Sequence, residues 1–199
     1  MNKLTLPTLS ALALSLVCTQ VFAVDGTIRV NGVITDGTCT LQGGSGVSGL
    51  KDLTVTLPTL PKSRFSPTTQ IPTQFGYAMY LKNATGTANC DAATSKALKG
   101  VHLSAISPDD LDTTDKSLLV NKATGAGGAS ATNPVFIRLY TQASRIIDLS
   151  ALWGTQESSQ VLNSSGNIQI IYNIAYVSKT GIVDAQNVQA KINYTLMYN

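Results

Sequence analysis

The chain ends in VQAKINYTLMYN, residues 188–199, and this stretch decides the fold. Apolar and polar side chains alternate along it, a period of two that predicts a β-strand with one apolar face. The apolar positions are Ala190, Ile192, Tyr194, Leu196 and Tyr198. Such a strand is either paired within its own chain as an ordinary edge strand, or it leaves an open edge that a partner must fill, because an uncovered apolar edge promotes aggregation.

A second alternating stretch lies near the other end, in GTIRVNGVITDGTC, Gly26–Cys39. One face of it carries Ile28, Val30, Gly32 and Ile34. No predicted strand precedes it with which it could form a short hairpin. Gly32 interrupts an otherwise aliphatic face and has two interpretations: a bulge or bend in an ordinary strand, or a point where the surface facing it leaves no room for a side chain.

Between these two stretches the sequence predicts more strands and little helix. Strand-forming residues recur at 75–81, 101–106, 134–140, 145–149 and 168–177, and a helical turn is possible near 91–98. Turn-rich segments such as GGSGVSG, residues 43–49, separate them. Because no sustained helical period occurs, we expect a single all-β domain built as an antiparallel sandwich.

The composition argues against catalysis. Charged residues make up 13% of the chain, and it has a single His, a single Glu and three Cys. Few side chains are therefore available for acid–base or metal chemistry, and we expect no enzyme, no catalytic residues, no metal and no cofactor. The charges are scattered, so the small net charge of +3 does not indicate a nucleic-acid surface, and no nucleic-acid partner is expected.

Three weaker signals are interpreted as structural. His102 lies in a predicted strand and has no nucleophile beside it in any catalytic motif. The aspartates of residues 109–115 lack the turn glycine and final glutamate of a calcium loop, which favours a solvated acidic loop. Trp153 is the single Trp of the chain and is expected in the core or at its rim, with sugar stacking as the alternative.

Residues 1–23, MNKLTLPTLSALALSLVCTQVFA, have the features of a signal peptide. Lys3 precedes an apolar stretch, and the small residue Ala23 marks the expected cleavage point. Cys18 leaves with this segment, so the exported chain keeps Cys39 and Cys90. An even pair of cysteines in an oxidising compartment predicts one disulfide, which stabilises the fold by about 4 kcal/mol in the chain-entropy model.

Four segments together resemble the type 1-like fimbrial subunits of chaperone–usher pili. They are GTIRVNGVITDGTC at 26–39, NCD at 89–91, GASATNPVFIRLY at 128–140 and AKINYTLMYN at 190–199. No single segment is diagnostic, but the signal peptide, the spacing of the cysteines and the penultimate tyrosine occur in the family's order. The resemblance covers essentially the whole exported chain.

The resemblance implies an immunoglobulin-like sandwich that lacks its last strand and is completed by donor-strand exchange. Residues 24–36 would be the donor extension, with Ile28, Val30, Gly32 and Ile34 facing the neighbouring subunit, and residues 37–199 the pilin domain. A periplasmic chaperone would cover the strand of Ala190, Ile192, Tyr194, Leu196 and Tyr198, and would hold Tyr198 and the terminal carboxylate. At an outer-membrane usher, neighbouring pilin subunits would then join into a homopolymer.

The expected function is therefore a structural pilin, the major shaft subunit of an extracellular fimbrium that supports cell adhesion. The sequence departs from the family at Gln186, where related subunits often carry glycine, so the start of the last strand stays open. Gly26 also stands where related subunits often carry an apolar residue. The alternative is a monomeric, secreted β-sandwich that binds a ligand such as a carbohydrate.

Overall fold

The computed structural model describes residues 29, 30, 32, 34 and 39–198. The chain divides into two units, Met1–Gly32 and Val33–Asn199, and the second unit carries the β-sheet fold. The predicted signal peptide, residues 1–23, lies outside the described residues. Within the described part of the chain, no helix is both long enough and apolar enough to cross a membrane.

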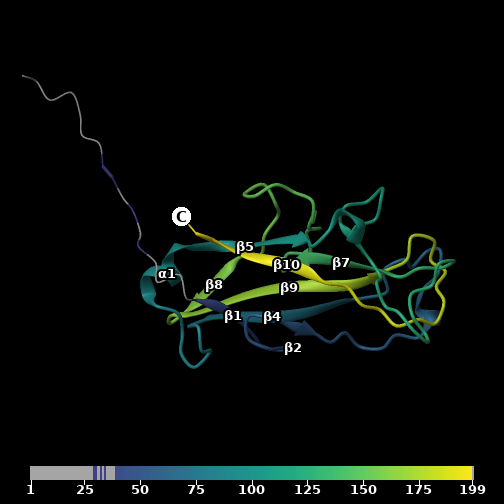
Figure 1. Cartoon of the computed structure of the whole chain (residues 1–199), viewed down its shortest axis with the longest axis horizontal. Coiled ribbons are helices and arrows are strands. Elements are labelled where there is room, and N and C mark those ends of the chain that lie inside the picture. The colour runs from purple at the N-terminus through teal and green to yellow at the C-terminus, as the bar shows by residue number, and fades with distance from the viewer. Residues whose placement is uncertain (1–28, 31, 33, 35–38, 199) are drawn as a thin grey trace, which may run out of the picture. The chain divides into compact units, whose positions relative to one another are not determined.

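Two antiparallel sheets and a small hairpin make up the fold, as the all-β prediction requires (Figure 1). The larger sheet has the order β1 (Thr40–Gly43), β4 (Gln74–Lys82), β9 (Asn167–Val177), β7 (Phe136–Thr141) and β6 (Leu118–Val120), and β8 (Val161–Ser164) also pairs with β9. The second sheet pairs β5 (Leu98–Ala105) with β10 (Ile192–Tyr198). The hairpin pairs β2 (Val47–Ser48) with β3 (Thr54–Val55).

Helices are short, as expected for a chain with no sustained helical period. The predicted turn at 91–98 forms α1 (Ala92–Ala97), which begins where the Asp91 carboxylate accepts a hydrogen bond from the Thr94 amide at 2.9 Å. Two 3₁₀ turns, η1 (Lys62–Arg64) and η2 (Pro108–Asp110), occur in loops. A proline and the Ser107 capping box begin η2.

The strand prediction at 145–149 is wrong, although its side-chain pattern is right. Ile147 and Leu149 are buried in the core as an alternating pair should be. Their backbone amides, however, donate to two different partners, the carbonyls of Leu139 and Lys116. A strand needs one continuous neighbour, and this segment forms only the single bridge of Tyr140 with Ile146.

One apolar core joins the two sheets. Tyr77 on β4 and Tyr172 on β9 stack with ring centroids 6.0 Å apart, and the Tyr172 hydroxyl donates to the carbonyl of Val101 on β5 at 3.2 Å. Burial raises the pKa of Tyr172 to about 12, so the phenol stays protonated and remains a donor. This hydrogen bond ties the larger sheet to β5 through the middle of the core.

The predicted disulfide is present between Cys39 and Cys90, with their Cα atoms 5.6 Å apart. It joins the residue before β1 to the residue before Asp91, the N-cap of α1. The Asp91 carboxylate lies 3.8 Å from Cys39 Sγ and 3.6 Å from Cys90 Sγ. The start of β1 is therefore joined covalently to the start of α1.

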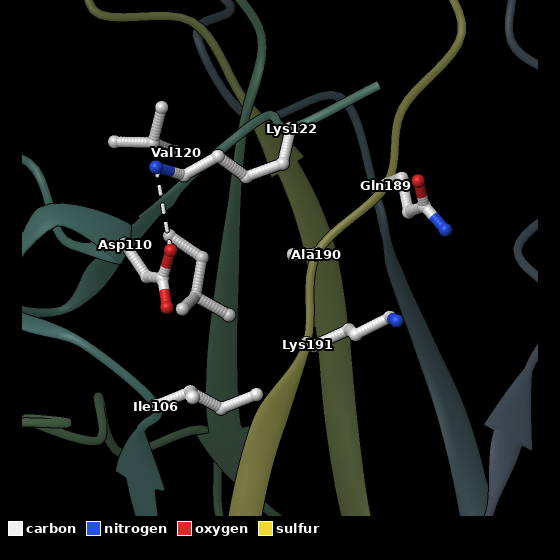
Figure 2. A pocket seen from close by; sticks show the side chains of 8 residues that line it. Ile106, Asp110, Val120, Lys122, Gln189, Ala190 and Lys191 are labelled. Atoms are coloured by element: carbon white, nitrogen blue, oxygen red, sulfur yellow. Dashed lines mark ion pairs between the residues drawn. The ribbon is translucent and has the colours of Figure 1, made fainter. Parts of the chain in front are cut away.

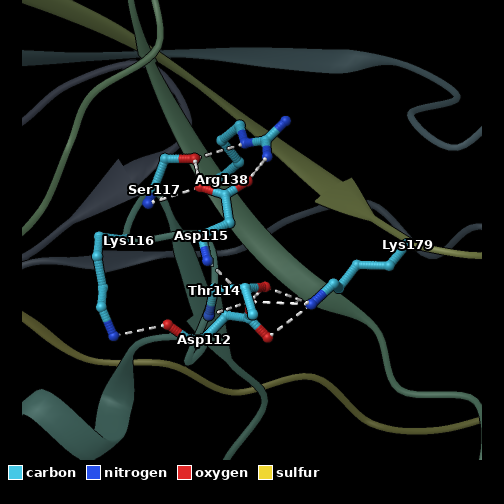
Figure 3. A network of polar contacts seen from close by, with 7 residues as sticks. All are labelled: Asp112, Thr114, Asp115, Lys116, Ser117, Arg138 and Lys179. Carbon is cyan, nitrogen blue, oxygen red and sulfur yellow. Dashed lines mark hydrogen bonds and ion pairs between the residues drawn. The ribbon is translucent and has the colours of Figure 1, made fainter.

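The aspartates of residues 109–115 are less solvated than predicted, because three of them are ion-paired. Figure 3 shows the pairs of Asp112 and Asp115. Lys179 Nζ lies 3.0 Å from both carboxylate oxygens of the buried Asp112. Asp115 pairs with Arg138, and Asp110 pairs with Lys122 at 3.3 Å. The interpretation as a solvated loop holds only for Asp109, whose side chain makes no ion pair among the described residues.

This network predicts a loss of stability in acid. Burial alone would raise the pKa of Asp112, but hydrogen bonds from Lys179 and Thr114 outweigh it and hold that pKa well below its usual range. A carboxyl with a lowered folded-state pKa stabilises the fold above its unfolded pKa of about 3.9 and loses that contribution as the pH falls further. We expect the free energy of unfolding, measured in urea, to fall between about pH 5 and pH 2. The fall of this free energy with pH should be shallower in Asp112→Asn than in the control Asp109→Asn. Equal pH dependence in the two variants would contradict the role of Asp112.

Candidate subunit interface at the C-terminal strand

The strand β10 carries a row of apolar side chains that face the core without being fully buried. We call Ala190, Ile192, Tyr194, Leu196 and Tyr198 the C-terminal row. All five are half-buried and pack against the main core cluster, whereas Lys191, Asn193 and Thr195 between them are exposed. The core-facing residues of β9, in contrast, are buried along the whole strand, including Ile168, Ile170 and Tyr172. The C-terminal row therefore forms part of the core with its outer side uncovered.

In the part of the chain that the structure describes, β10 has one strand neighbour, β5. Figure 1 shows the two strands side by side. Their register places Tyr194 opposite Leu103 and Ile192 opposite Ala105. A two-stranded sheet has two edges, and the two edges of this one differ.

The far edge of β5 is closed by the chain's own loop. The Leu103 amide donates to Gln156 Oε1 at 2.8 Å, and Gln156 Nε2 donates to the Leu103 carbonyl at 2.6 Å. The Ala105 amide donates to the Leu149 carbonyl at 3.3 Å. An amide side chain and a loop therefore take the place of a further strand on this side.

These bonds also reveal where the backbone of β10 points. Leu103 and Ala105 direct their peptide groups away from β10, so their cross-strand pairs are of the non-hydrogen-bonded type. In such a pair the partner residue points its own N–H and C=O away as well. Ile192 and Tyr194 therefore present these groups along the other edge of β10, and Leu196 follows two residues later. The same residues supply the half-buried side chains and the edge-facing backbone groups.

A pocket of about 280 Å³ lies where β10 begins (Figure 2). Its apolar side is formed by Ile106, Leu119, Val120 and Ala190. Polar side chains complete the lining, namely Asp110, Lys122, Gln189 and Lys191. Ala190, the smallest residue of the C-terminal row, thus lies beside open space, and more than half of the Ile106 surface, 54%, is exposed.

Gln186 and Asn121 hold the segment that leads into β10. The Gln186 carboxamide accepts from the Ser130 and Val135 amides and donates to the carbonyls of Asn133 and Asp184, at 3.0–3.3 Å. The buried Asn121 donates to Gln186 Oε1 and to the Asn187 carbonyl, and accepts from the Gln189 amide. The last strand, whose start the sequence left open, begins at Ile192. Gln186, which stands where related subunits often carry glycine, hydrogen-bonds several backbone groups instead.

Replacing Gln186 by Ala should therefore destabilise the fold. The change leaves several partly buried backbone groups without a partner, which costs about 2–3 kcal/mol. Gln189→Ala is the matched control, because it removes the same atoms from an exposed side chain that makes no hydrogen bond among the described residues, and it should cost about 0.5 kcal/mol or less. Urea unfolding measures both variants, and equal stabilities would contradict the role of Gln186.

The other end of the C-terminal row lies near Asp91, the residue that follows Cys90 of the disulfide. Tyr198 pairs with Leu98 after an irregularity in the register between Met197 and Tyr198. Burial, and then the negative charge of Asp91, raises the pKa of Tyr198, so its phenol stays neutral beside this carboxylate. Asn199 and the terminal carboxylate lie outside the described residues, so the predicted grip on that carboxylate stays a prediction.

Two of the predicted donor residues have exposed side chains. Val30 is 88% exposed and Ile34 is 95% exposed. Ile28 lies outside the described residues. The predicted role of these side chains stays a prediction.

No family model matches the chain. Curated relatives do. The F17 fimbrial protein of Escherichia coli is 24% identical over 176 residues, 88% of each chain. The major fimbrial subunit SMF-1 of Stenotrophomonas maltophilia is 25% identical over 181 residues, 89% of this chain and 94% of the relative. The resemblance to fimbrial subunits is confirmed.

Solved structures support the fold. The P pilus rod subunit PapA matches with a TM-score of 0.52 at 14% identity, over 87% of this chain and all of PapA. A subunit in the structure of a chaperone–usher pilus, solved to explain rod uncoiling, matches with a TM-score of 0.50 at 16% identity over 87% of this chain. The fold is thus the immunoglobulin-like fold of pilus subunits.

The sequence did not predict two side chains that form this site by binding backbone groups more than 50 residues away. Gln156 closes the edge of β5 from 53 residues away, and Gln186 binds backbone groups more than 50 residues earlier. The departure from the family glycine was the one signal that marked Gln186. Nothing local marks Gln156.

Proposed function

We propose that this chain is a structural, non-catalytic subunit of a chaperone–usher fimbria that polymerises by donor-strand exchange. Residues 24–36 of one copy add as a strand along β10 of the next. The observation that carries the proposal is that Ile192, Tyr194 and Leu196 offer half-buried apolar side chains and edge-facing peptide groups at once. An added strand completes a backbone ladder and covers the C-terminal row in a single step.

The energetics suit a polymer held together without covalent bonds. Ile28, Val30 and Ile34 each contribute about 1.5–3 kcal/mol when fully buried, in addition to the backbone ladder. In the part of the chain that the structure describes, Gln156 already closes the β5 edge of the two-stranded sheet, so the β10 edge of that sheet is open to a neighbouring subunit. Each copy then has one donor extension and one acceptor edge, and such head-to-tail contacts produce filaments.

The same edge requires cover before assembly. An unpaired apolar strand aggregates, so a periplasmic chaperone occupies β10 after export and an outer-membrane usher catalyses its replacement by the next subunit. Tyr198 at the end of the C-terminal row is the expected chaperone contact. The product is an extracellular fimbrium, in which this chain serves as the major shaft subunit and supports adhesion. The curated relative named a major fimbrial subunit favours that role.

The proposal is tested with the chain from Val24 onward carrying Val30→Asp and Ile34→Asp, a donor-blocked chain that keeps its acceptor edge. A synthetic peptide of residues 25–36 is added, and thermal unfolding is followed by circular dichroism. Burial of the aliphatic side chains and the new ladder should raise Tm by about 15 °C or more. A peptide carrying the same two Asp substitutions is the control and should leave Tm unchanged. No response to either peptide would show a self-complete sandwich and overturn the proposal.

A further inference from the structure

The two oxygens of the Asp91 carboxylate have different neighbours. Oδ1 accepts a hydrogen bond from the Thr94 amide at 2.9 Å and so caps α1. Oδ2 lies 3.6 Å from Cys90 Sγ and 3.8 Å from Cys39 Sγ. The sulfurs of a disulfide carry no proton, so Oδ2 lies against the bond without accepting a hydrogen bond from it. The helix cap therefore holds a carboxylate oxygen beside both sulfurs.

The negative charge at this place is not neutralised by its neighbours. Hydrogen bonds from the side chain and the amide of Thr94 lower the pKa of Asp91, so its carboxyl is ionised at neutral pH. In the described part of the chain no cation forms an ion pair with it. Lys82 donates instead to Asn89 Oδ1 at 2.7 Å, and the Tyr198 phenol beside Asp91 stays neutral.

The cap by itself does not need this charge. Asn caps a helix about as well as Asp, because its side-chain oxygen accepts the same hydrogen bond. An anion also interacts favourably with the first turn of a helix, which is the structural alternative for Asp91. That effect concerns the stability of α1, whereas an anion beside two sulfurs also acts on the reactivity of the disulfide.

Reduction of a disulfide passes through an anionic transition state. A thiolate attacks one sulfur, a new S–S bond forms, and the electron pair of the old bond leaves on the other sulfur as a thiolate. Cys39 is half-buried and Cys90 is 7% exposed, so attack occurs at Cys39 Sγ and Cys90 Sγ is the leaving group. A second reagent thiolate then releases Cys39, so that two cysteine thiols and one reagent disulfide result. Negative charge thus develops on the sulfurs beside which Asp91 holds its own charge.

We propose that Asp91 protects the disulfide from reduction by repelling both the attacking thiolate and the thiolate that leaves on Cys90. Two like charges about 4 Å apart in water slow such a step about fivefold. The protection is kinetic, because the disulfide and the two protonated thiols are both uncharged and only the path between them carries the charge. It goes beyond the proposed function, since it concerns the lifetime of the bond in any assembly state.

The test compares reduction rates of the chain from Val24 onward, at concentrations where ultracentrifugation shows a monomer. The reductant is 2-mercaptoethanol, and free thiols are alkylated and counted by mass spectrometry. Asp91→Asn keeps the cap and should be reduced about fivefold faster than the wild type. Asp109→Asn is the matched control, because it removes the same charge from η2, which follows the other end of β5, and it should leave the rate unchanged.

The charge of the reductant gives an independent measurement. Cysteamine carries an ammonium group, 2-mercaptoethanol is uncharged apart from its thiol, and mercaptoacetate carries a carboxylate. Each rate is divided by the rate of the same reagent with 2-hydroxyethyl disulfide. The wild type should react fastest with cysteamine and slowest with mercaptoacetate, and both Asp91→Asn and salt at about 1 M should narrow this range.

The outcomes separate the charge of Asp91 from its role in the fold. Unchanged rates in Asp91→Asn would overturn the proposal. Equal acceleration with all three reagents would also overturn it, because a loosened helix cap exposes the bond to every thiol alike. If circular dichroism shows that Asp91→Asn is misfolded, the wild-type rates decide alone, and a range of rates that salt does not narrow contradicts the proposal.

Discussion

Replacing Val30 by Asp is expected to abolish polymer formation while leaving the isolated subunit as stable as before. Val30 is 88% exposed in the structure, and a substitution at an exposed position should change the free energy of unfolding by about 0.5 kcal/mol or less. In the proposed assembly the same side chain lies against the core of a neighbouring copy. An aspartate there loses the burial of the valine and adds an unpaired charge to an apolar site.

The two losses together exceed about 4 kcal/mol, which corresponds to a weakening of each subunit contact by at least about 1,000-fold. Analytical ultracentrifugation and electron microscopy of the chain from Val24 onward measure the result, with urea unfolding as the measure of stability. Asn31→Asp is the matched control, because it places the same carboxylate on the alternate face of the strand. If Val30→Asp polymerises as well as Asn31→Asp, residue 30 does not face the neighbouring subunit.

The strands that could be predicted from the sequence are those whose side chains alternate against a single core. β4, β9 and most of β10 appear where their pattern indicates. Alternation alone, however, predicted that the last strand begins at residue 188, and β10 begins at Ile192. The reason is that the backbone groups of Gln189 are already hydrogen-bonded elsewhere. Its amide donates to the Asn121 side chain and its carbonyl accepts from the Lys122 amide, so residue 189 does not pair with β5.

The polar contacts could not be predicted because their partners are distant in sequence. Lys179 neutralises Asp112 from 67 residues away, and the four neighbouring aspartates gave no sign of which one would be buried. The closure of the β5 edge depends on Gln156 in the same way. The apolar side chains of the proposed interface can thus be predicted from the local alternation of apolar and polar residues. Which edge of the sheet stays open depends instead on contacts between loops that are distant in sequence.

Replacing both Cys39 and Cys90 by Ser should produce the largest loss of stability in the isolated subunit. The disulfide closes a loop with a sequence separation of 51, and its removal is expected to lower the free energy of unfolding by about 4 kcal/mol. For a domain of this size that loss lowers Tm by about 8–16 °C. Reduction of the unsubstituted chain should reproduce the effect, whereas the same reductant should leave the Ser variant unchanged.

The location of this disulfide gives the loss a second consequence. Cys39 follows the proposed donor extension, residues 24–36, and Cys90 precedes Asp91, whose charge acts on Tyr198 at the end of the C-terminal row. Without the bond the last part of β10 is less firmly held, so the 25–36 peptide should dissociate faster from a donor-blocked chain with both Ser substitutions. An unchanged dissociation rate together with the full loss of stability would show that the disulfide supports the fold and not the acceptor edge. An unchanged stability would show that the packing of Leu41 and Leu81, which belong to the same core cluster as Cys90, holds this region without the disulfide.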